Sequence, residues 1–319
     1  MKRLLGFASN HPVLGAAVFM AVLPFLTPYT ALAISILIYG LYALGFNIVY
    51  GQVGLLSFGH AAFLGGGAYA CGILLTRFQA PWWAAIAGGV VMGAVLAAAM
   101  GALAVRARGI YFAMVTLALG QIVYFAFNQA ERWTGGENGL RGVNLRTVAL
   151  PGFTFDFVQP WHRYALVAAF VLAAVALLAR ILASPFGGAM VAVRENESRA
   201  RACGFDVRLI RLQAMVLSGA FCGLAGALLA LHLSIVPIET LHYTTGGEAV
   251  VMTILGGAGT LFGPFVGAAA FLALENVLSL YTENWPLVVG IVFVLFILTL
   301  REGIWGAVTA LARRIAARA

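Results

Sequence analysis

Long apolar runs, separated by short polar stretches, follow one another along almost the whole chain. A bilayer core about 30 Å thick needs about 20 apolar residues per helix, with every backbone polar group bonded within it. This length predicts nine spans, at 12–28, 30–50, 57–76, 82–104, 109–129, 161–183, 212–235, 263–282 and 286–303. A further stretch, 247–260, is too short for a straight span and is expected to be a half-helix or a re-entrant segment. We therefore predict an all-α polytopic membrane bundle of about ten transmembrane helices, forming a single domain over residues 1–319.

The composition agrees with a membrane protein. Apolar residues make up 62% of the chain and charged residues 9%, whereas a soluble domain carries roughly a quarter charged residues. The 38 glycines are typical of membrane helices that pack closely or break. Cys71, Cys203 and Cys222 lie far apart and without a CxxC spacing, so we expect packing residues rather than disulfides or a metal site.

Lysine and arginine in the loops predict the orientation. If the N-terminus is cytoplasmic and 247–260 crosses the membrane, fourteen of the nineteen basic residues fall on the inner side. Both termini are therefore expected in the cytoplasm, and the first apolar run is expected to be a retained helix rather than a cleaved signal. The net charge of +8 then reflects topology, and nucleic-acid binding is not expected.

Charge is concentrated in "AVRENESRARACGFDVRLIR" (192–211), which holds eight of the thirty charged residues. Val193, Ala200 and Cys203 fall on one stripe, and Gly204 stands where the end of a helix favours a positive φ. The pattern predicts a short helix in a cytoplasmic loop at 185–211. The alternating charge of this helix is consistent with docking into another protein. It is equally consistent with a solvated cytoplasmic loop that is rich in arginine only because cytoplasmic loops of membrane proteins carry an excess of positive charge.

Four tracts carry a resemblance to a known family. They are "NIVYGQVGLLSFGHAAFLGGGAYA", "GIYFAMVTLALGQIV", "FGGAMVAVRENESRARACGFDVRLIRLQAMVLSGAFCGLAGALLA" and "VVMTILGGAGTLFGPFVGAA". In this order they resemble the permease subunit of branched-chain amino-acid ABC importers, the LivM type, over about residues 30–305. The resemblance implies an inverted-repeat importer permease in the bacterial inner membrane, which translocates branched-chain or other hydrophobic amino acids.

The resemblance also implies partners. They are a second, similar but distinct permease subunit, two ATPase subunits and a periplasmic or extracellular substrate-binding protein. The charged loop would be the segment that couples to the ATPase, through Arg194, Glu195, Asn196, Ala200 and Gly204. The chain has no G-x-x-x-x-G-K-[ST] phosphate loop. We therefore expect no enzyme activity, and no cofactor in this chain, with ATP and Mg²⁺ bound by the partner ATPase.

Polar side chains at membrane depth are costly, and they usually face a partner or a transport path. The candidates for the path are Ser57, His60, Thr116, Gln121, Glu248, Glu275 and Asn276. Hydrogen bonding between helices is the alternative for each of them, and Glu248 could instead complement the N-terminus of the half-helix. The tracts 51–63 and 246–259 occupy corresponding places in two halves of opposite topology, as an inverted repeat would give. The outer loop 130–160 fits a lid or a docking surface.

Other functions remain open from the residues. A urea or short-amide importer would use a closely similar permease, and a simple-sugar permease is more distant. An enzyme acting on lipid would need catalytic side chains gathered at one membrane face, and the five histidines share no motif. A stand-alone ion-coupled carrier would tolerate the glycine breaks but gives the charged loop no role.

Overall fold

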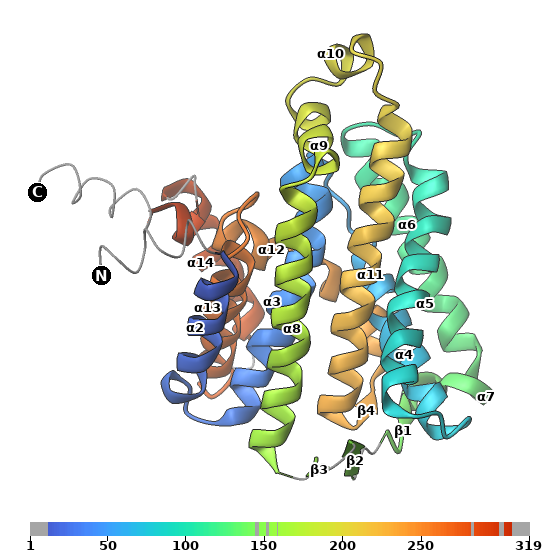
Figure 1. Ribbon diagram of the computed structural model, residues 1–319, viewed down its shortest axis with the longest axis vertical. Helices are drawn as coiled ribbons and strands as arrows, with labels where there is room; N and C mark the ends of the chain where they lie inside the picture. The colour runs from blue at the N-terminus through green and yellow to red at the C-terminus, as the bar shows by residue number, and fades with distance from the viewer. Residues whose placement is uncertain are drawn as a thin grey trace, which may run out of the picture.

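The computed structural model describes residues 12–143, 147–150, 153–157, 159–281, 284–299 and 303–307. Tilted helices run between two ends, which we call the α10 end and the hairpin end (top and bottom of Figure 1). Within the described residues, ten helices make up the bundle: α2 (Pro12–Leu26), α3 (Thr30–Asn47), α4 (His60–Thr76), α5 (Trp82–Ala104), α6 (Ile110–Gln129), α8 (Pro160–Leu182), α11 (Val207–Leu233), α12 (Tyr243–Gly256), α13 (Gly263–Leu278) and α14 (Trp285–Thr299).

The shorter elements lie at the ends of these helices. They are the π-helix η1 (Ile48–Gln52), which continues α3, α7 (Glu131–Thr134), α9 (Pro185–Glu195), α10 (Glu197–Ala202) and the 3₁₀ turns η2 (Gly136–Asn138) and η3 (Ile238–Leu241). Five helices in the described part of the chain are long and apolar enough to cross a membrane unaided, namely α3 with η1, α5, α6, α8 and α11. The all-α membrane bundle is confirmed.

Local sequence signals set where several helices begin. Proline occupies the first turn of α8, α9 and α13, as Pro160, Pro185 and Pro264, where its missing N–H costs nothing. Asp206 caps α11, because its Oδ1 accepts the backbone N–H of Arg208 at 3.0 Å. This cap places the start of α11 at Val207, five residues before the predicted span.

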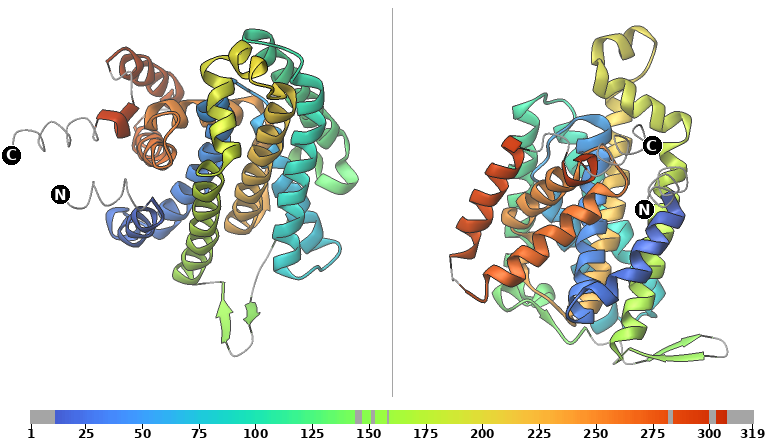
Figure 2. Two further views of the ribbon diagram at one scale, coloured as in Figure 1. Left: turned by 45° about the horizontal axis from the view of Figure 1, so that its top comes forward. Right: turned by 90° about the vertical axis from the view of Figure 1, so that its left-hand side faces the viewer.

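Two small antiparallel pairs lie at the hairpin end. Strand β1 (Leu140–Arg141) pairs with β4 (Ile235–Val236), and β2 (Thr147–Leu150) pairs with β3 (Phe153–Asp156), with Thr147 opposite Asp156. The β2–β3 hairpin projects from the bundle (Figure 2). The outer loop expected at 130–160 therefore contains α7, η2 and strands, which the sequence pattern did not predict.

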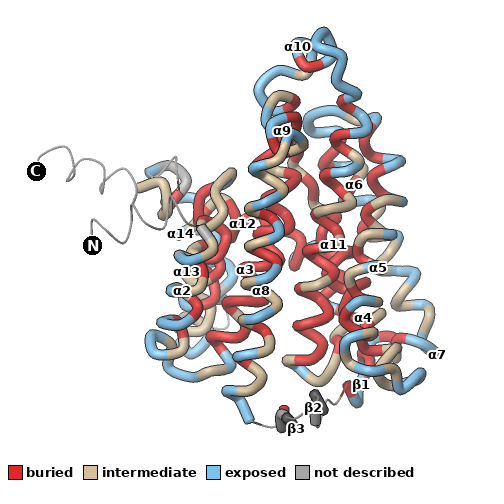
Figure 3. The backbone as a smooth tube through the Cα atoms, in the orientation of Figure 1, coloured by how far each residue is buried: buried red, intermediate tan, exposed pale blue. Residues whose placement is uncertain are grey.

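Among the five long apolar helices, α3 and α11 are the most enclosed, and buried residues gather along them (Figure 3). Here α11 packs against α4 and α5 through five glycines, which we call the glycine seam: Gly67, Gly89, Gly93, Gly219 and Gly223. A Cβ atom placed on Gly223 would lie 2.4 Å from the Gly89 carbonyl oxygen, and one on Gly93 would lie 2.2 Å from the Gly219 carbonyl oxygen. The helices therefore meet backbone to backbone, as small residues permit where lipid supplies no hydrophobic drive.

Two segments without α-helix enter the bundle from opposite ends. Residues 54–59 precede α4 from the α10 end, and residues 234–242, which include β4 and η3, lead to α12 from the hairpin end. The first segment meets the start of α12 inside the bundle, because a Cβ atom on Gly246 of α12 would lie 2.6 Å from the Phe58 carbonyl oxygen. The 14 residues of α12 span about 21 Å. The predicted short crossing is thus a half-helix that starts within the bundle.

The described basic side chains separate between the two ends. The loop 105–109 and the segment 183–206 lie at the α10 end (Figure 1). The residues at or near that end are Arg106, Arg108, Arg180, Arg194, Arg199, Arg201, Arg208 and Arg211, whereas Arg77, Arg132, Arg141 and Arg163 lie toward the hairpin end. The other basic residues that were used to predict the orientation lie outside the described residues: Lys2, Arg3, Arg146, Arg301, Arg313, Arg314 and Arg318.

Candidate functional site

The charged loop forms two short helices rather than the single one predicted. Asn196 separates α9 from α10 with an extended backbone (φ −160°, ψ 102°). Its side-chain Oδ1 accepts the backbone N–H of Arg199 at 2.9 Å and the hydroxyl of Ser198 at 2.7 Å. Asparagine is a favoured N-cap because its side chain satisfies a free N–H of the first turn. The sequence contained this signal, which turns the chain at Asn196.

The predicted role of Gly204 at the end of a helix is confirmed. Its φ is +87°, and its N–H donates to the Arg201 carbonyl at 2.9 Å, while the N–H of Phe205 donates to the Ala200 carbonyl at 3.2 Å. These two bonds close α10 in the Schellman pattern, which requires a residue with positive φ. Nothing lies within 4 Å of a Cβ position on Gly204. Glycine is therefore needed there for its backbone conformation.

Glu197 holds α10 to the rest of the α10 end. Its carboxylate receives Arg211 Nη2 at 2.8 Å, Arg201 Nη2 at 2.5 Å and Arg108 Nη2 at 3.3 Å. Arg211 belongs to α11 and is buried, and Arg108 belongs to the loop before α6. Partial desolvation of the Glu197 carboxyl is outweighed by the charges of Arg211, Arg108 and Arg201, which lower its pKa below the ordinary value. The sequence pattern alone does not distinguish Glu197 from the charged residues around it.

The expected coupling residues face different surroundings. Arg194, Glu195, Asn196 and Gly204 are exposed, whereas Ala200 is 4% exposed and packs against the chain itself. Cys203, at the end of α10, is exposed, so the expectation that it packs inside was wrong. Cys71 and Cys222 are buried, as predicted.

Arg194 reaches from α9 to two helix breaks, namely η1 with the segment before α4, and the loop between α12 and α13. Its guanidinium donates to the carbonyl oxygen of Gly51 in η1. Gln52 Nε2 donates to the Gly259 carbonyl at 3.1 Å, in the loop that joins α12 to α13. Asn47 forms two hydrogen bonds with the same loop. Its Nδ2 donates to the Thr260 carbonyl, and its Oδ1 accepts the Gly259 N–H, both at 2.8 Å. We call these residues the break junction: Asn47, Gly51, Gln52, Arg194, Gly259 and Thr260.

His60 ties three elements together inside the bundle. Its Nδ1 lies 3.0 Å from Ser57 Oγ, and its Nε2 lies 2.9 Å from Ser218 Oγ of α11. Ser218 in turn donates to the Gly45 carbonyl at 2.7 Å. His60, Ser57 and Ser218 are fully buried. Their geometry therefore fits hydrogen bonding between helices, the alternative raised from the sequence.

Thr116 is also fully buried, and its hydroxyl donates to the Ala113 carbonyl at 2.9 Å. The same oxygen accepts the Phe58 N–H at 3.3 Å, so that α6 holds the segment before α4. Gln121, further along α6, is half-buried. The structure thus places Thr116 in packing and leaves Gln121 toward the surface.

Two carboxylates lie between α3, α12 and α13. Glu248 and Glu275 interact electrostatically with one another and with Tyr39, and both are half-buried. The neighbouring Asn276 accepts the Tyr29 hydroxyl at 2.7 Å. Glu248 stands in the second turn of α12, because that helix begins at Tyr243. The idea that Glu248 caps the half-helix is therefore wrong.

Polar and aromatic side chains also stand on the outside of the bundle where α6 meets α12. Glu239, Tyr243 and Thr244 are exposed, and the rings of Tyr124 and His242 lie 5.5 Å apart. The start of α12 lies deep in the bundle, beside Phe58. We call this surface, with Gln121, the α6–α12 face. Exposed polar groups at such depth need a partner or water.

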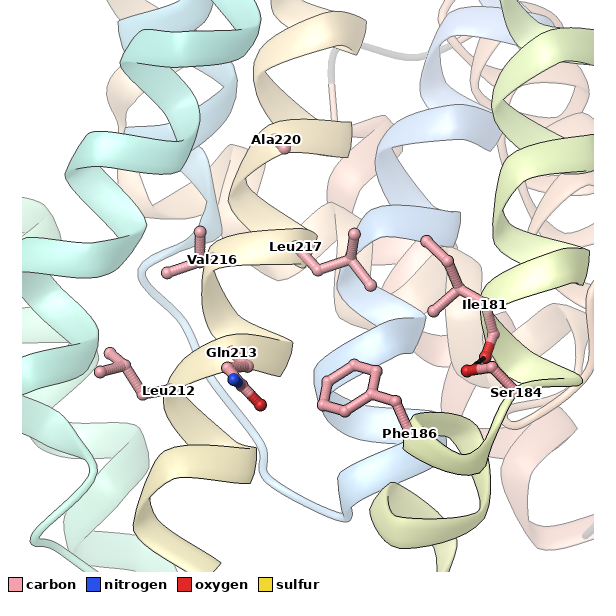
Figure 4. Close-up of a pocket in the computed structure, with 8 residues that line it drawn as sticks. All are labelled: Ile181, Ser184, Phe186, Leu212, Gln213, Val216, Leu217 and Ala220. Carbon is pink, nitrogen blue, oxygen red and sulfur yellow. Dashed lines mark hydrogen bonds between the residues drawn. The ribbon is translucent and has the colours of Figure 1, made fainter.

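An apolar groove opens on another side, between α8, α9 and α11 (Figure 4). Its volume is about 750 Å³, and its lining residues are Ile181, Ser184, Phe186, Leu212, Gln213, Val216, Leu217 and Ala220. Ser184 already donates to the Ile181 carbonyl at 2.6 Å. The groove thus offers few polar groups and is poorly suited to a charged solute.

Comparison with known proteins identifies the family. The model of the family described as the branched-chain amino acid transport system permease component matches residues 29–300. This chain belongs to that family. The resemblance found in the sequence tracts is thereby confirmed, and the protein is a multi-pass membrane permease component.

Two LivM relatives align with most of this permease, and a third relative aligns with about half of it. The permease is 28% identical over 287 residues to the high-affinity branched-chain amino acid permease protein LivM of Escherichia coli, covering 84% of this chain and 68% of that protein. It is 27% identical to LivM of Salmonella typhimurium over 86% of this chain and 69% of that protein. An autoinducer 2 import permease, LsrC of Klebsiella pneumoniae, is 33% identical over 47% of this permease and 43% of LsrC. No solved structure matches significantly.

Proposed function

We propose that this permease is the membrane subunit of an ATP-driven importer for branched-chain or other hydrophobic amino acids. An external binding protein would deliver the substrate, and partner subunits would bind ATP with Mg²⁺ and hydrolyse it. The observation that carries the proposal is the capped α9–α10 segment, which projects at one end and bonds through Arg194 to the broken helices. Because the α9–α10 segment projects from the bundle and is bonded to the helix breaks, a partner ATPase that moves this segment would also move the breaks.

The α10 end is taken as cytoplasmic in this proposal. Eight described arginines lie at or near it, against four toward the hairpin end, and cytoplasmic loops carry the excess of positive charge. The membrane would then be the bacterial inner membrane, with both termini inside. The ATPase would meet Glu195, Asn196 and Gly204, which are exposed, while the buried Ala200 would let α10 lie close to its own chain.

The transport path would run along the α6–α12 face. The exposed Tyr243 and Thr244 at membrane depth support this location, since a second permease subunit with a similar face would shield them and leave a polar path between the two chains. Half-buried Glu248 and Gln121 lie on the same two helices. The buried Ser57, His60 and Thr116 would support the path without lining it, as helix packing explains their bonds.

The similarity to LsrC favours a second candidate within the same mechanism. That protein is named for import of autoinducer 2, so that the family handles more than one kind of solute. A small polar solute such as urea or a short amide is therefore the alternative substrate.

Uptake of labelled leucine, urea and a simple sugar in a strain deleted for this gene tests the proposal. We expect restored leucine uptake on re-expression, dependent on the ATPase and binding-protein genes. Uptake of leucine that persists without any ATPase would contradict the ATP-driven mechanism. Restored urea uptake without leucine uptake would replace the substrate.

A further inference from the structure

Arg194 points toward the transmembrane helices rather than along the projection of α10. Its guanidinium bonds to the Gly51 carbonyl, and its aliphatic stem covers Gly54, where a Cβ atom would lie 3.2 Å from Arg194 Cγ. The same guanidinium stands beside Gly259, where a Cβ atom would lie 3.2 Å from Nη1. Arg194 thus contacts both helix breaks at once, the one between α3 and α4 and the one between α12 and α13.

Arg194 is an exposed residue, yet the hydrogen bond that its guanidinium makes is directed inward, to the Gly51 carbonyl. The ion pairs found among the described residues all involve Glu197, so Arg194 has no carboxylate partner there. A guanidinium bonded to a carbonyl oxygen forms a charge-assisted bond, stronger than one between neutral groups. Its planar guanidinium is larger than a lysine ammonium, so that it bonds to the Gly51 carbonyl while it also stands beside Gly259.

The two segments that Arg194 contacts are places where regular α-helical geometry is interrupted. Residues 48–52 form a π-helix, residues 54–59 are non-helical, and 257–262 form a loop. A π-helical turn frequently marks a functional site, and a hinge absorbs motion in a few backbone dihedrals. Asn47 and Gln52 bond the two segments to each other, so that a pull on one is passed to the other.

We propose that Arg194 is a positioning residue that transmits movement of α9–α10 to both helix breaks, instead of contacting the ATPase. The inference rests on the proposed function. A partner that displaces α9 would shift Gly51 and Gly259 together, and with them the starts of α4 and α13. The break junction would then open or close the path.

The test uses the permease reconstituted in liposomes with its ATPase and binding protein. Arg194→Ala is compared with Arg194→Lys and with Arg180→Ala, a matched control at an exposed arginine of α8, outside both the α9–α10 segment and the break junction. We expect Arg194→Ala to copurify with the ATPase and to hydrolyse ATP. Substrate taken up per ATP should fall about tenfold, as loss of one charge-assisted bond implies, with partial recovery in the lysine variant and no change in Arg180→Ala.

Hydrogen exchange gives a readout that a merely structural role would not move. In the wild-type complex, ATP should change exchange at 48–59 and 257–262, and Arg194→Ala should abolish that response. Gln52→Leu removes a neighbouring bond and should uncouple similarly, and it carries the test if Arg194→Ala does not insert. Unchanged uptake per ATP, or loss of the ATPase from Arg194→Ala, would overturn the inference. A wild-type complex without ATP-dependent uptake would instead refute the proposed function.

Discussion

Substituting Gly223 by alanine tests how closely α5 and α11 approach. The added Cβ atom would lie 2.4 Å from the Gly89 carbonyl oxygen, whereas ordinary contacts begin near 3.4 Å. The colliding atom is backbone, so the two helices must separate by about 1 Å along the glycine seam. Overpacking of this kind costs about 1–3 kcal/mol. We expect Gly223→Ala to lower the free energy of unfolding by about 2 kcal/mol relative to a matched glycine-to-alanine control.

Gly290 of α14 supplies that control. It also lies inside an apolar helix, but nothing stands within 4 Å of its Cβ position. Both substitutions raise helix propensity alike, and so their difference isolates the collision. The assay is unfolding of purified protein in mixed micelles, followed by circular dichroism. Equal unfolding midpoints for the two variants would refute the backbone-to-backbone packing.

Three further changes probe other parts of the molecule. His60→Ala removes both bonds to Ser57 and Ser218 and should destabilise the fold by about 3 kcal/mol in the same assay, whereas a loss below about 1 kcal/mol would contradict a bonding role. The lowered pKa of Glu197 means that its contribution is complete above the ordinary carboxyl value of about 4.3 and is lost as pH falls through the lowered value. A spin label on exposed Cys203 should therefore become mobile only when the pH falls below the ordinary carboxyl range, and Glu197→Gln should make the label mobile at neutral pH. Gly204→Val forces a positive φ on a branched residue, which costs about 1–2 kcal/mol, and should therefore reduce copurification of the ATPase. The control Gly188→Val lies in open space on α9 and should not reduce it. Equal losses in the two variants would argue against an ATPase contact that depends on the shape of α10.

Much of the helical framework follows from local pattern. The apolar runs place the ten longer helices, without α7, α9 and α10, to within about five residues at each end, because a membrane forces each helix to satisfy its own backbone. Gly204 was found because the end of a helix needs a positive φ. Asn196 was assigned to the ATPase contact, although its cap signal also predicts the division between α9 and α10.

The contacts of the site depend on packing that no local pattern contains. His60 and Ser218 are 158 residues apart, and only the approach of α4 to α11 makes them partners. Asn47 and Gln52 carry the same signal as His60, a polar group in an apolar run, yet their bonds to Gly259 could not be predicted without the loop after α12. Glu197 resembles its charged neighbours until Arg211 is placed beside it.

The glycine seam has a mechanical consequence. Where helices touch through main-chain atoms, no side chain can rotate to absorb a sliding motion, and α4, α5 and α11 should therefore move as one rigid body. Conformational change during a transport cycle is then confined to the segments where α-helical geometry is interrupted. These segments would act as hinges, and the rigid body formed by α4, α5 and α11 would stay fixed while they move.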